Sequence, residues 1–172
     1  NEEAFSDTAD DDISITSADD PEDINEKAIP EIIEKPIVQL VNTIFADAIK
    51  KKASDIHIEP IEQKVEIRYR LDGDLHNVLE LPRKTLAPMI SRIKILSRLD
   101  ISLTRIPQDG KLRVQRHGDT IEMRVSTLPT NYGEKAVVRI LNPTMTRQPL
   151  EELGFPPDVE KPFKTAISQH QG

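Results

Sequence analysis

Cysteine and tryptophan are absent from the 172 residues, and tyrosine and phenylalanine together number only six. Without cysteine the chain can form neither a disulfide nor a thiolate metal site, which favours a cytosolic protein. No apolar run approaches the roughly 20 residues that a helix needs to cross a bilayer. The N-terminus is acidic, whereas a secretory signal would be basic. The composition therefore indicates a soluble domain with an aliphatic core.

Glycine is scarce as well, with six in the chain, and no glycine-rich loop ends in Gly-Lys-Ser or Gly-Lys-Thr. A Gly-x-Ser-x-Gly elbow and a His-Glu-x-x-His zinc motif are also missing from the sequence. These residues can assist at a phosphate site, but they cannot build a complete one. We therefore expect no catalytic residues and no metal in this chain.

The net charge of −7 is unevenly distributed along the chain. Residues 1–28 hold eleven acidic side chains against one lysine, a net charge of −10, whereas the other 144 residues hold 19 acidic and 22 basic side chains. The first segment lacks hydrophobic periodicity and cannot bury enough apolar area to offset its ordering entropy. We predict an acidic flexible linker over 1–28, an α+β domain over 29–145 and a connector with a short final helix over 146–172.

Hydrophobic periodicity supplies the elements of the middle segment. A helix is predicted from Pro36 to about Lys52, because apolar residues recur there at helical spacing. A second helix is predicted over 83–98, and its several basic residues are expected to form a solvated face. Turns are predicted at 72–73, 108–110 and 117–119. Alternating patterns predict six strands, at about 55–59, 64–70, 75–80, 111–116, 120–127 and 134–141.

Strand parity predicts a face rich in arginine. Successive side chains of a strand point to opposite sides of a sheet, so the polar face receives one arginine from nearly every strand. Arginine suits phosphate because its planar, permanently charged guanidinium donates two parallel hydrogen bonds. Nearby acidic residues could instead pair with the cluster as an ordinary solvated ion network. The arginines concerned are Arg68, Arg70, Arg113, Arg124 and Arg139.

Asp55, His57 and Glu59 share one face of a single strand. Alternate side chains of a strand are about 7 Å apart, so one metal ion could not easily take all three as ligands. The pattern favours a hydrogen-bonded histidine between two carboxylates that meet neighbouring arginines. A small metal-dependent enzyme using these three residues is the less favoured reading.

Six short motifs in fixed order make a family resemblance specific. They cover 53–60, 67–73, 92–96, 107–110, 124–129 and 133–140. The series resembles the N-terminal domain that precedes the motor domain in ATPases of type II secretion and type IV pilus assembly. The resemblance covers about residues 36–172. It implies a PAS-like α+β domain, with a mainly antiparallel sheet of about six strands packed with two helices.

The resemblance also implies a function. In such motors the arginines that correspond to Arg124 and Arg139 reach the phosphates of ATP bound by the adjoining core, and Arg68, Arg70, Arg113 and Arg105 would support them. The resemblance implies that ATP and Mg bind to the full-length protein, and that this fragment alone does not hydrolyse ATP. The implied partners are the core, neighbouring subunits of a hexamer and platform proteins of the inner membrane, without nucleic acid. The implied location is cytoplasmic, at the inner membrane through these partners.

One departure from the family pattern stands before the 107–110 motif. The family commonly has glutamate where this chain has Leu103, which deprives Arg105 of its usual local partner. A free-standing PAS-like sensor or protein-interaction module is the alternative function, and it would require an internal ligand cavity.

Overall fold

The structure, a computed structural model, describes residues 13–17, 35–116, 119–141, 150 and 154–169. The chain divides into two compact units, 1–141 and 142–172. The elements are β1 (Ile13–Ser17), α1 (Lys35–Lys50), β2 (Asp55–Pro60), β3 (Lys64–Leu71), β4 (Asp74–Pro82), η2 (Arg83–Thr85), α2 (Leu86–Leu96), β5 (Gln108–Arg116), β6 (Asp119–Thr130), β7 (Gly133–Leu141) and α4 (Pro157–Ile167).

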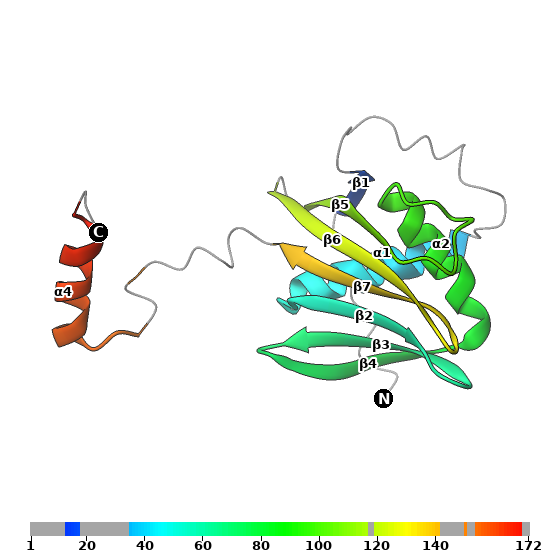
Figure 1. The fold of residues 1–172 in the computed structure, drawn as a ribbon, viewed down its shortest axis with the longest axis horizontal. Coiled ribbons are helices and arrows are strands. Elements are labelled where there is room, and N and C mark those ends of the chain that lie inside the picture. The colour runs from blue at the N-terminus through cyan, green and yellow to red at the C-terminus, as the bar shows by residue number, and fades with distance from the viewer. Residues whose placement is uncertain (1–12, 18–34, 117–118, 142–149, 151–153, 170–172) are drawn as a thin grey trace. The chain divides into compact units, whose positions relative to one another are not determined.

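The first unit is built on one sheet of seven strands in the order β1-β5-β6-β7-β2-β3-β4. Every neighbouring pair is antiparallel. The helices α1 and α2 lie together against one face of this sheet and leave the other face open (Figure 1). The predicted α+β class, with an antiparallel sheet and two packed helices, is confirmed.

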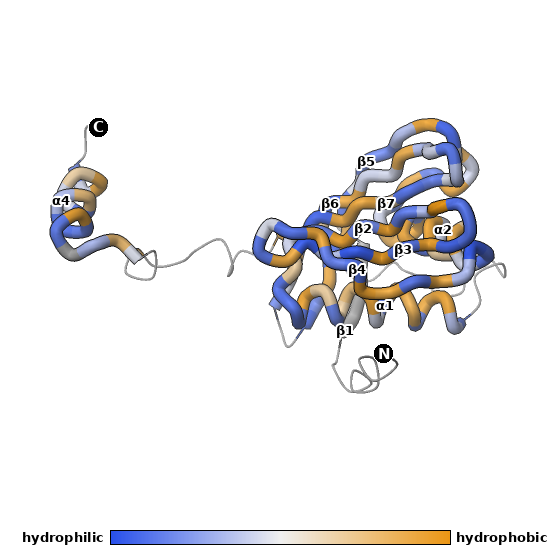
Figure 2. Tube along the Cα trace, turned by 90° about the horizontal axis from the view of Figure 1, so that it is seen from below, coloured by the Kyte–Doolittle hydropathy of each residue, from blue (hydrophilic) through white to orange (hydrophobic). Residues whose placement is uncertain are grey.

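The core forms where the helices meet the sheet. Along β3, Val65, Ile67 and Tyr69 are fully buried, whereas the residues between them remain partly exposed. This alternation of burial follows the two-residue period of a strand. Figure 2 shows hydrophilic and hydrophobic residues alternating along the strands of the sheet. The Tyr69 hydroxyl donates a hydrogen bond of 2.9 Å to the Ile44 carbonyl oxygen, which ties β3 to α1. Burial raises the pKa of Tyr69 far above its ordinary value.

Both predicted helices are present, but one property of the second was predicted incorrectly. The apolar stripe of α1 is buried as expected, and the helix ends at Lys50. In α2, however, Arg92 and Lys94 are only 5% and 1% exposed. The basic residues of this helix therefore do not form a single solvated face, because Arg92 and Lys94 are buried.

Two segments depart from the predicted elements. Ile13–Ser17 forms strand β1, paired with β5, within the segment predicted to be a linker; the rest of 1–28 lies outside the described residues, as do 117–118 of the third predicted turn. Residues 108–110, predicted as a turn, begin β5. A Cβ at Gly110 would lie 2.6 Å from the Ser97 carbonyl oxygen, so glycine is needed there for close approach of the chain after α2.

The predicted hairpin at Asp72–Gly73 is confirmed, since both residues have positive φ and join β3 to β4. In the second unit the described part of the predicted connector contains α4, whose apolar residue Phe163 stacks on Phe155 at 5.2 Å between ring centroids. Pro162 lies inside this helix, with Pro157 in its first turn. Residues 142–149 and 151–153 lie outside the described part.

Candidate phosphate-binding face

A row of charged residues crosses the open face of the sheet. The register sets Lys111 of β5 opposite Arg124 of β6, Arg124 opposite Arg139 of β7, Arg139 opposite Asp55 of β2, and Asp55 opposite Arg70 of β3. Neighbouring strands lie about 5 Å apart, so each member of the row is next to the following one. Four cations therefore share one line with a single carboxylate.

Arg124 and Arg139 lie side by side on this row, as strand parity predicts. Both are exposed. Arg124 has no ion pair with any residue in the described part of the chain. Like charges directly opposite each other on a sheet repel, and an anion between them would relieve that repulsion.

Arg139 is anchored at one point. Its Nε donates a hydrogen bond of 3.0 Å to Asp55 Oδ1, while 67% of its side chain stays exposed. A guanidinium has five N–H groups, and among the described residues only the one nearest the stem has a partner. Within that part of the chain, the two terminal amino groups of Arg139 remain available to an anion.

Asp55 is the buried member of the row, with a side chain that is only 8% exposed. Its Oδ2 accepts a hydrogen bond of 2.8 Å from the Ser54 hydroxyl and lies 3.3 Å from Arg70 Nε. Burial by itself raises the pKa of Asp55, but the hydrogen bonds from Arg139 and Ser54 and the nearby charges of Arg139 and Arg70 outweigh it and lower the pKa below its ordinary value. The carboxylate is therefore held in its charged form.

Arg70 and Arg68 are engaged within the sheet and are less available than Arg139. Arg70 Nη1 donates a hydrogen bond of 2.7 Å to the Gly73 carbonyl oxygen, in addition to facing Asp55. Arg68 Nη2 forms an ion pair with Glu59 Oε2. Asp55 and Glu59 thus meet neighbouring arginines, as the sequence predicts.

The remaining predicted arginines lie outside this row. Arg113 is exposed on the same face of β5, opposite Glu122 of β6. Arg105 is exposed in the segment between α2 and β5 and is not part of a strand. Leu103 contributes its carbonyl oxygen to hydrogen bonds from Lys94 Nζ at 2.8 Å and Gln108 Nε2 at 3.0 Å.

Lys111 was not among the residues predicted from the sequence. Its side chain is 63% exposed, and its Nζ lies 3.3 Å from Glu122 Oε1. The signal was available, because parity places Lys111 and Arg113 on the same face of β5.

His57 lies on β2 between Asp55 and Glu59. Its Nδ1 is 3.4 Å from Glu59 Oε1 but forms no hydrogen bond with any described residue. The prediction of a hydrogen-bonded histidine is therefore wrong at this nitrogen, because the approach to Glu59 is not a hydrogen bond. Within the residues that the structure describes, no group of three or more histidine or acidic side chains is arranged to hold a metal ion.

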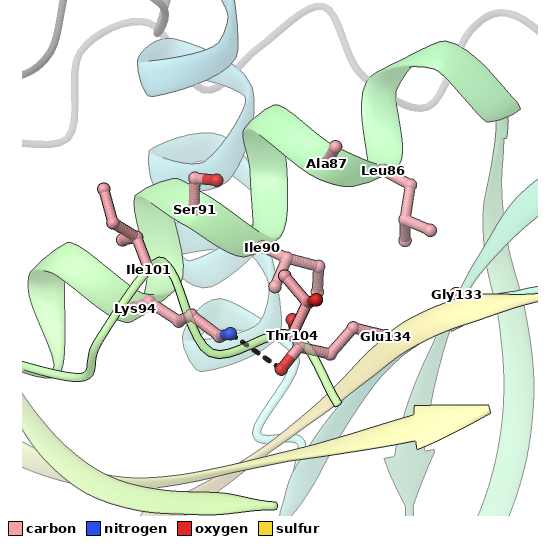
Figure 3. Close-up of a pocket in the computed structure, with 9 residues that line it drawn as sticks. All are labelled: Leu86, Ala87, Ile90, Ser91, Lys94, Ile101, Thr104, Gly133 and Glu134. Carbon is pink, nitrogen blue, oxygen red and sulfur yellow. Dashed lines mark ion pairs between the residues drawn. The ribbon is translucent and has the colours of Figure 1, made fainter. Parts of the chain in front are cut away.

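A separate pocket of about 190 Å³ lies beside α2 (Figure 3). Its lining is mostly apolar, and the side chains of Lys94 and Glu134 point toward one another there, with Nζ and Oε1 2.8 Å apart. The pocket is smaller than the roughly 300–1,000 Å³ typical of small-molecule sites. It is lined by Leu86, Ala87, Ile90, Ser91, Lys94, Ile101, Thr104, Gly133 and Glu134.

Among the described residues no helix is both long and apolar enough to span a membrane.

Comparison with known proteins identifies the family to which the chain is similar. The model of the family described as Type II/IV secretion system protein matches residues 31–172. The chain is 42% identical over 139 residues to type II secretion system protein E of Dickeya dadantii, and 41% identical over 163 residues to the type IV pilus assembly ATPase PilB of Myxococcus xanthus. These alignments cover 81% and 94% of this chain.

The chain spans 28% of the length of each of these two relatives. Among solved structures, the ATPase DotB of Legionella pneumophila is similar over 79% of this chain and 36% of its own, with a TM-score of 0.42 and 16% identity.

Proposed function

Because the chain belongs to the Type II/IV secretion system protein family, we propose that it is the regulatory, nucleotide-sensing domain of a hexameric ATPase that powers protein export or pilin polymerisation. The names of its relatives support an ATPase of secretion or pilus assembly as the parent protein. ATP and Mg would bind to a motor core elsewhere in that protein.

The observation that supports the proposal most directly is the pair Arg124 and Arg139. The two residues are opposite each other on adjacent strands, both are exposed, and the terminal amino groups of Arg139 are available. Two adjacent guanidiniums fit a chain of phosphates, because each can donate a pair of parallel hydrogen bonds to phosphate oxygens. Lys111 extends the same row by one strand and adds charge without a fixed geometry.

The domain would sense nucleotide through its position relative to the core. Bound MgATP supplies negative charge that is weaker after hydrolysis and release. Arg124 and Arg139 would contact that charge in a closed arrangement and lose the contact in an open one. A ligand shifts a conformational equilibrium only by such differential contacts. The resulting movement would be transmitted to neighbouring subunits and to platform proteins of the inner membrane, at its cytoplasmic side.

Replacement of Arg139 in the full-length protein tests the proposal. Arg139→Ala should lower kcat/KM for ATP by about 10²-fold, the loss typical of removing one donor that stabilises developing charge. Thermal stability should fall only modestly, because Ser54 and Arg70 remain as partners of the Asp55 carboxylate. Steady-state turnover of MgATP is the measurement.

Lys84→Ala is the matched control, because it removes an exposed cation outside the sheet, in η2. It should leave turnover unchanged. Normal turnover by the Arg139→Ala variant would remove the nucleotide role of this face.

A further inference from the structure

Asp55 is unusual among the acidic residues of the open face, because it is nearly buried and yet approached by arginine side chains from both neighbouring strands. Arg139 of β7 approaches one carboxylate oxygen, and Arg70 of β3 and the Ser54 hydroxyl approach the other. Two of these donors are separated from Asp55 by 84 and 15 positions in the sequence. The carboxylate therefore links three strands at one point.

The backbone around Asp55 is fixed as well. Ser54 N–H donates a hydrogen bond of 3.0 Å to the Arg70 carbonyl oxygen, and Ile140 N–H donates one of 2.9 Å to the Ser54 carbonyl oxygen. Asp55 thus follows a residue that is bonded to both neighbouring strands. A carboxylate held so firmly can determine where a flexible partner points.

The partner in question is Arg139. Arginine has a long, flexible side chain that loses rotamer entropy when it is fixed in one orientation. The bond from Nε to Asp55 fixes the guanidinium before any ligand arrives and uses the one N–H group that is not part of the terminal fork. Arg70 cannot take the same part, because its Nη1 is already bonded to the Gly73 carbonyl oxygen.

We infer that Asp55 is a positioning residue, which holds Arg139 by Nε so that both terminal amino groups point toward phosphate. The inference rests on the proposed function. Arg70 and Ser54 brace Asp55 from its other oxygen, and they would not themselves contact the ligand.

The inference and simple electrostatics predict opposite changes in the affinity for phosphate when Asp55 is replaced. Removing the negative charge of Asp55 makes the face more positive, so charge alone would strengthen its attraction for phosphate. Loss of positioning would weaken it, because a misplaced contact can cost up to about 10²-fold in rate. The two effects oppose each other, and the direction of the change separates them.

The test is a double-mutant cycle on MgATP turnover by the full-length protein. Asp55→Ala should lower kcat/KM by about tenfold or more, and it should have no further effect when Arg139 is already alanine. Asp55→Asn should lose less, because its amide oxygen still accepts a hydrogen bond from Nε. The control Glu59→Gln removes a negative charge from the same face at the partner of Arg68 and should not lower turnover.

The outcomes separate the inference from the function on which it rests. No effect of Arg139→Ala would remove the proposed function and this inference together. A severe Arg139→Ala effect with a neutral or faster Asp55→Ala variant would overturn the inference alone. An equal loss from Asp55→Ala in both backgrounds would assign Asp55 a purely structural role and would also overturn it.

A second measurement needs no substitution, in case Asp55→Ala fails to fold. In NMR spectra of the 172-residue chain, the Arg139 Nε–H proton should exchange with water more slowly than that of Arg124, which has no ion pair among the described residues. Equal exchange at the two sites would contradict the anchoring of Arg139 by Asp55.

Discussion

Strand β7 places two charged side chains on opposite sides of the sheet, and their surroundings differ. Glu134 faces the helices and is paired with Lys94 of α2, and both side chains are buried. Arg139 faces the open side and is paired with Asp55 of β2, with its own side chain 67% exposed. Both members of the first pair are buried, whereas most of the Arg139 side chain in the second pair is exposed to solvent. The same type of ion pair is thus structural in one place and suited to binding in the other.

Their energetic consequences differ for the same reason. Two buried charges lose their hydration, and their attraction offsets that loss only while both are present. In the second pair one partner remains hydrated, so less is lost on folding and less is at stake when the pair is broken. Breaking the first pair should therefore lower mainly the stability of the chain. Breaking the second pair should lower mainly the turnover of ATP by the full-length protein.

The largest effect on stability is expected from Glu134→Ala. This change leaves the Lys94 ammonium buried without its counter-ion, which should cost about 3–5 kcal/mol in the free energy of unfolding. Denaturant unfolding of the 172-residue chain measures it. Glu122→Ala, which breaks the exposed pair with Lys111, should cost less than about 1 kcal/mol.

Replacing both partners at once sharpens this expectation. A chain with Lys94→Met and Glu134→Leu should recover most of the stability, because neither apolar side chain needs a partner. If Glu134→Ala unfolded within about 1 kcal/mol of the unchanged chain, the buried pair would not have the importance assigned to it.

The sequence anticipated the open side of the sheet better than the side under the helices. Strand parity depends only on neighbouring residues, so it placed Arg124 and Arg139 on one face correctly. The burial of Lys94 depends on Glu134, which lies 40 positions further along the chain, and no local pattern of α2 contains that information. A basic helical residue is usually solvated, and here a long-range partner decided otherwise.

The same reasoning applies to two other elements. Strand β1 has five residues in an acidic segment and is held by pairing with β5, about 100 residues away in sequence. Gly110 looked like a turn residue, but close approach of Ser97 and Leu99 explains its presence in a strand. The sequence predicts that Asp55 meets neighbouring arginines. Which nitrogen of Arg139 contacts Asp55 depends on the geometry of the folded sheet, and no sequence pattern contains that information.

A smaller effect is expected from acid, and it tests whether Asp55 is held in its charged form. The folded-state pKa of Asp55 lies below its ordinary value of 3.8. A carboxyl group with a lowered pKa adds stability above its unfolded pKa and loses it as pH falls through the folded pKa. The contribution should therefore be constant near neutral pH and disappear below about pH 3.8.

Unfolding of the unchanged chain and of Asp55→Asn across this range provides the measurement. The difference in unfolding free energy between the two should shrink as the pH falls below 3.8. A difference that stayed constant down to the acid limit would mean that Asp55 is not held in its charged form by Arg139, Ser54 and Arg70.

The smallest effect is expected from Arg124→Ala, and its sign is informative. Arg124 has a cation on each side of it in the row, Lys111 and Arg139, so its removal should raise the free energy of unfolding by about 0.2–1 kcal/mol. The gain should diminish at high salt, which screens repulsion between exposed charges. The matched variant Arg113→Ala removes a cation that faces Glu122 and should change stability slightly in the opposite direction. A residue whose removal stabilises the chain but reduces turnover of the full-length protein is retained for binding. Loss of stability in Arg124→Ala would instead give this arginine a structural part in the sheet.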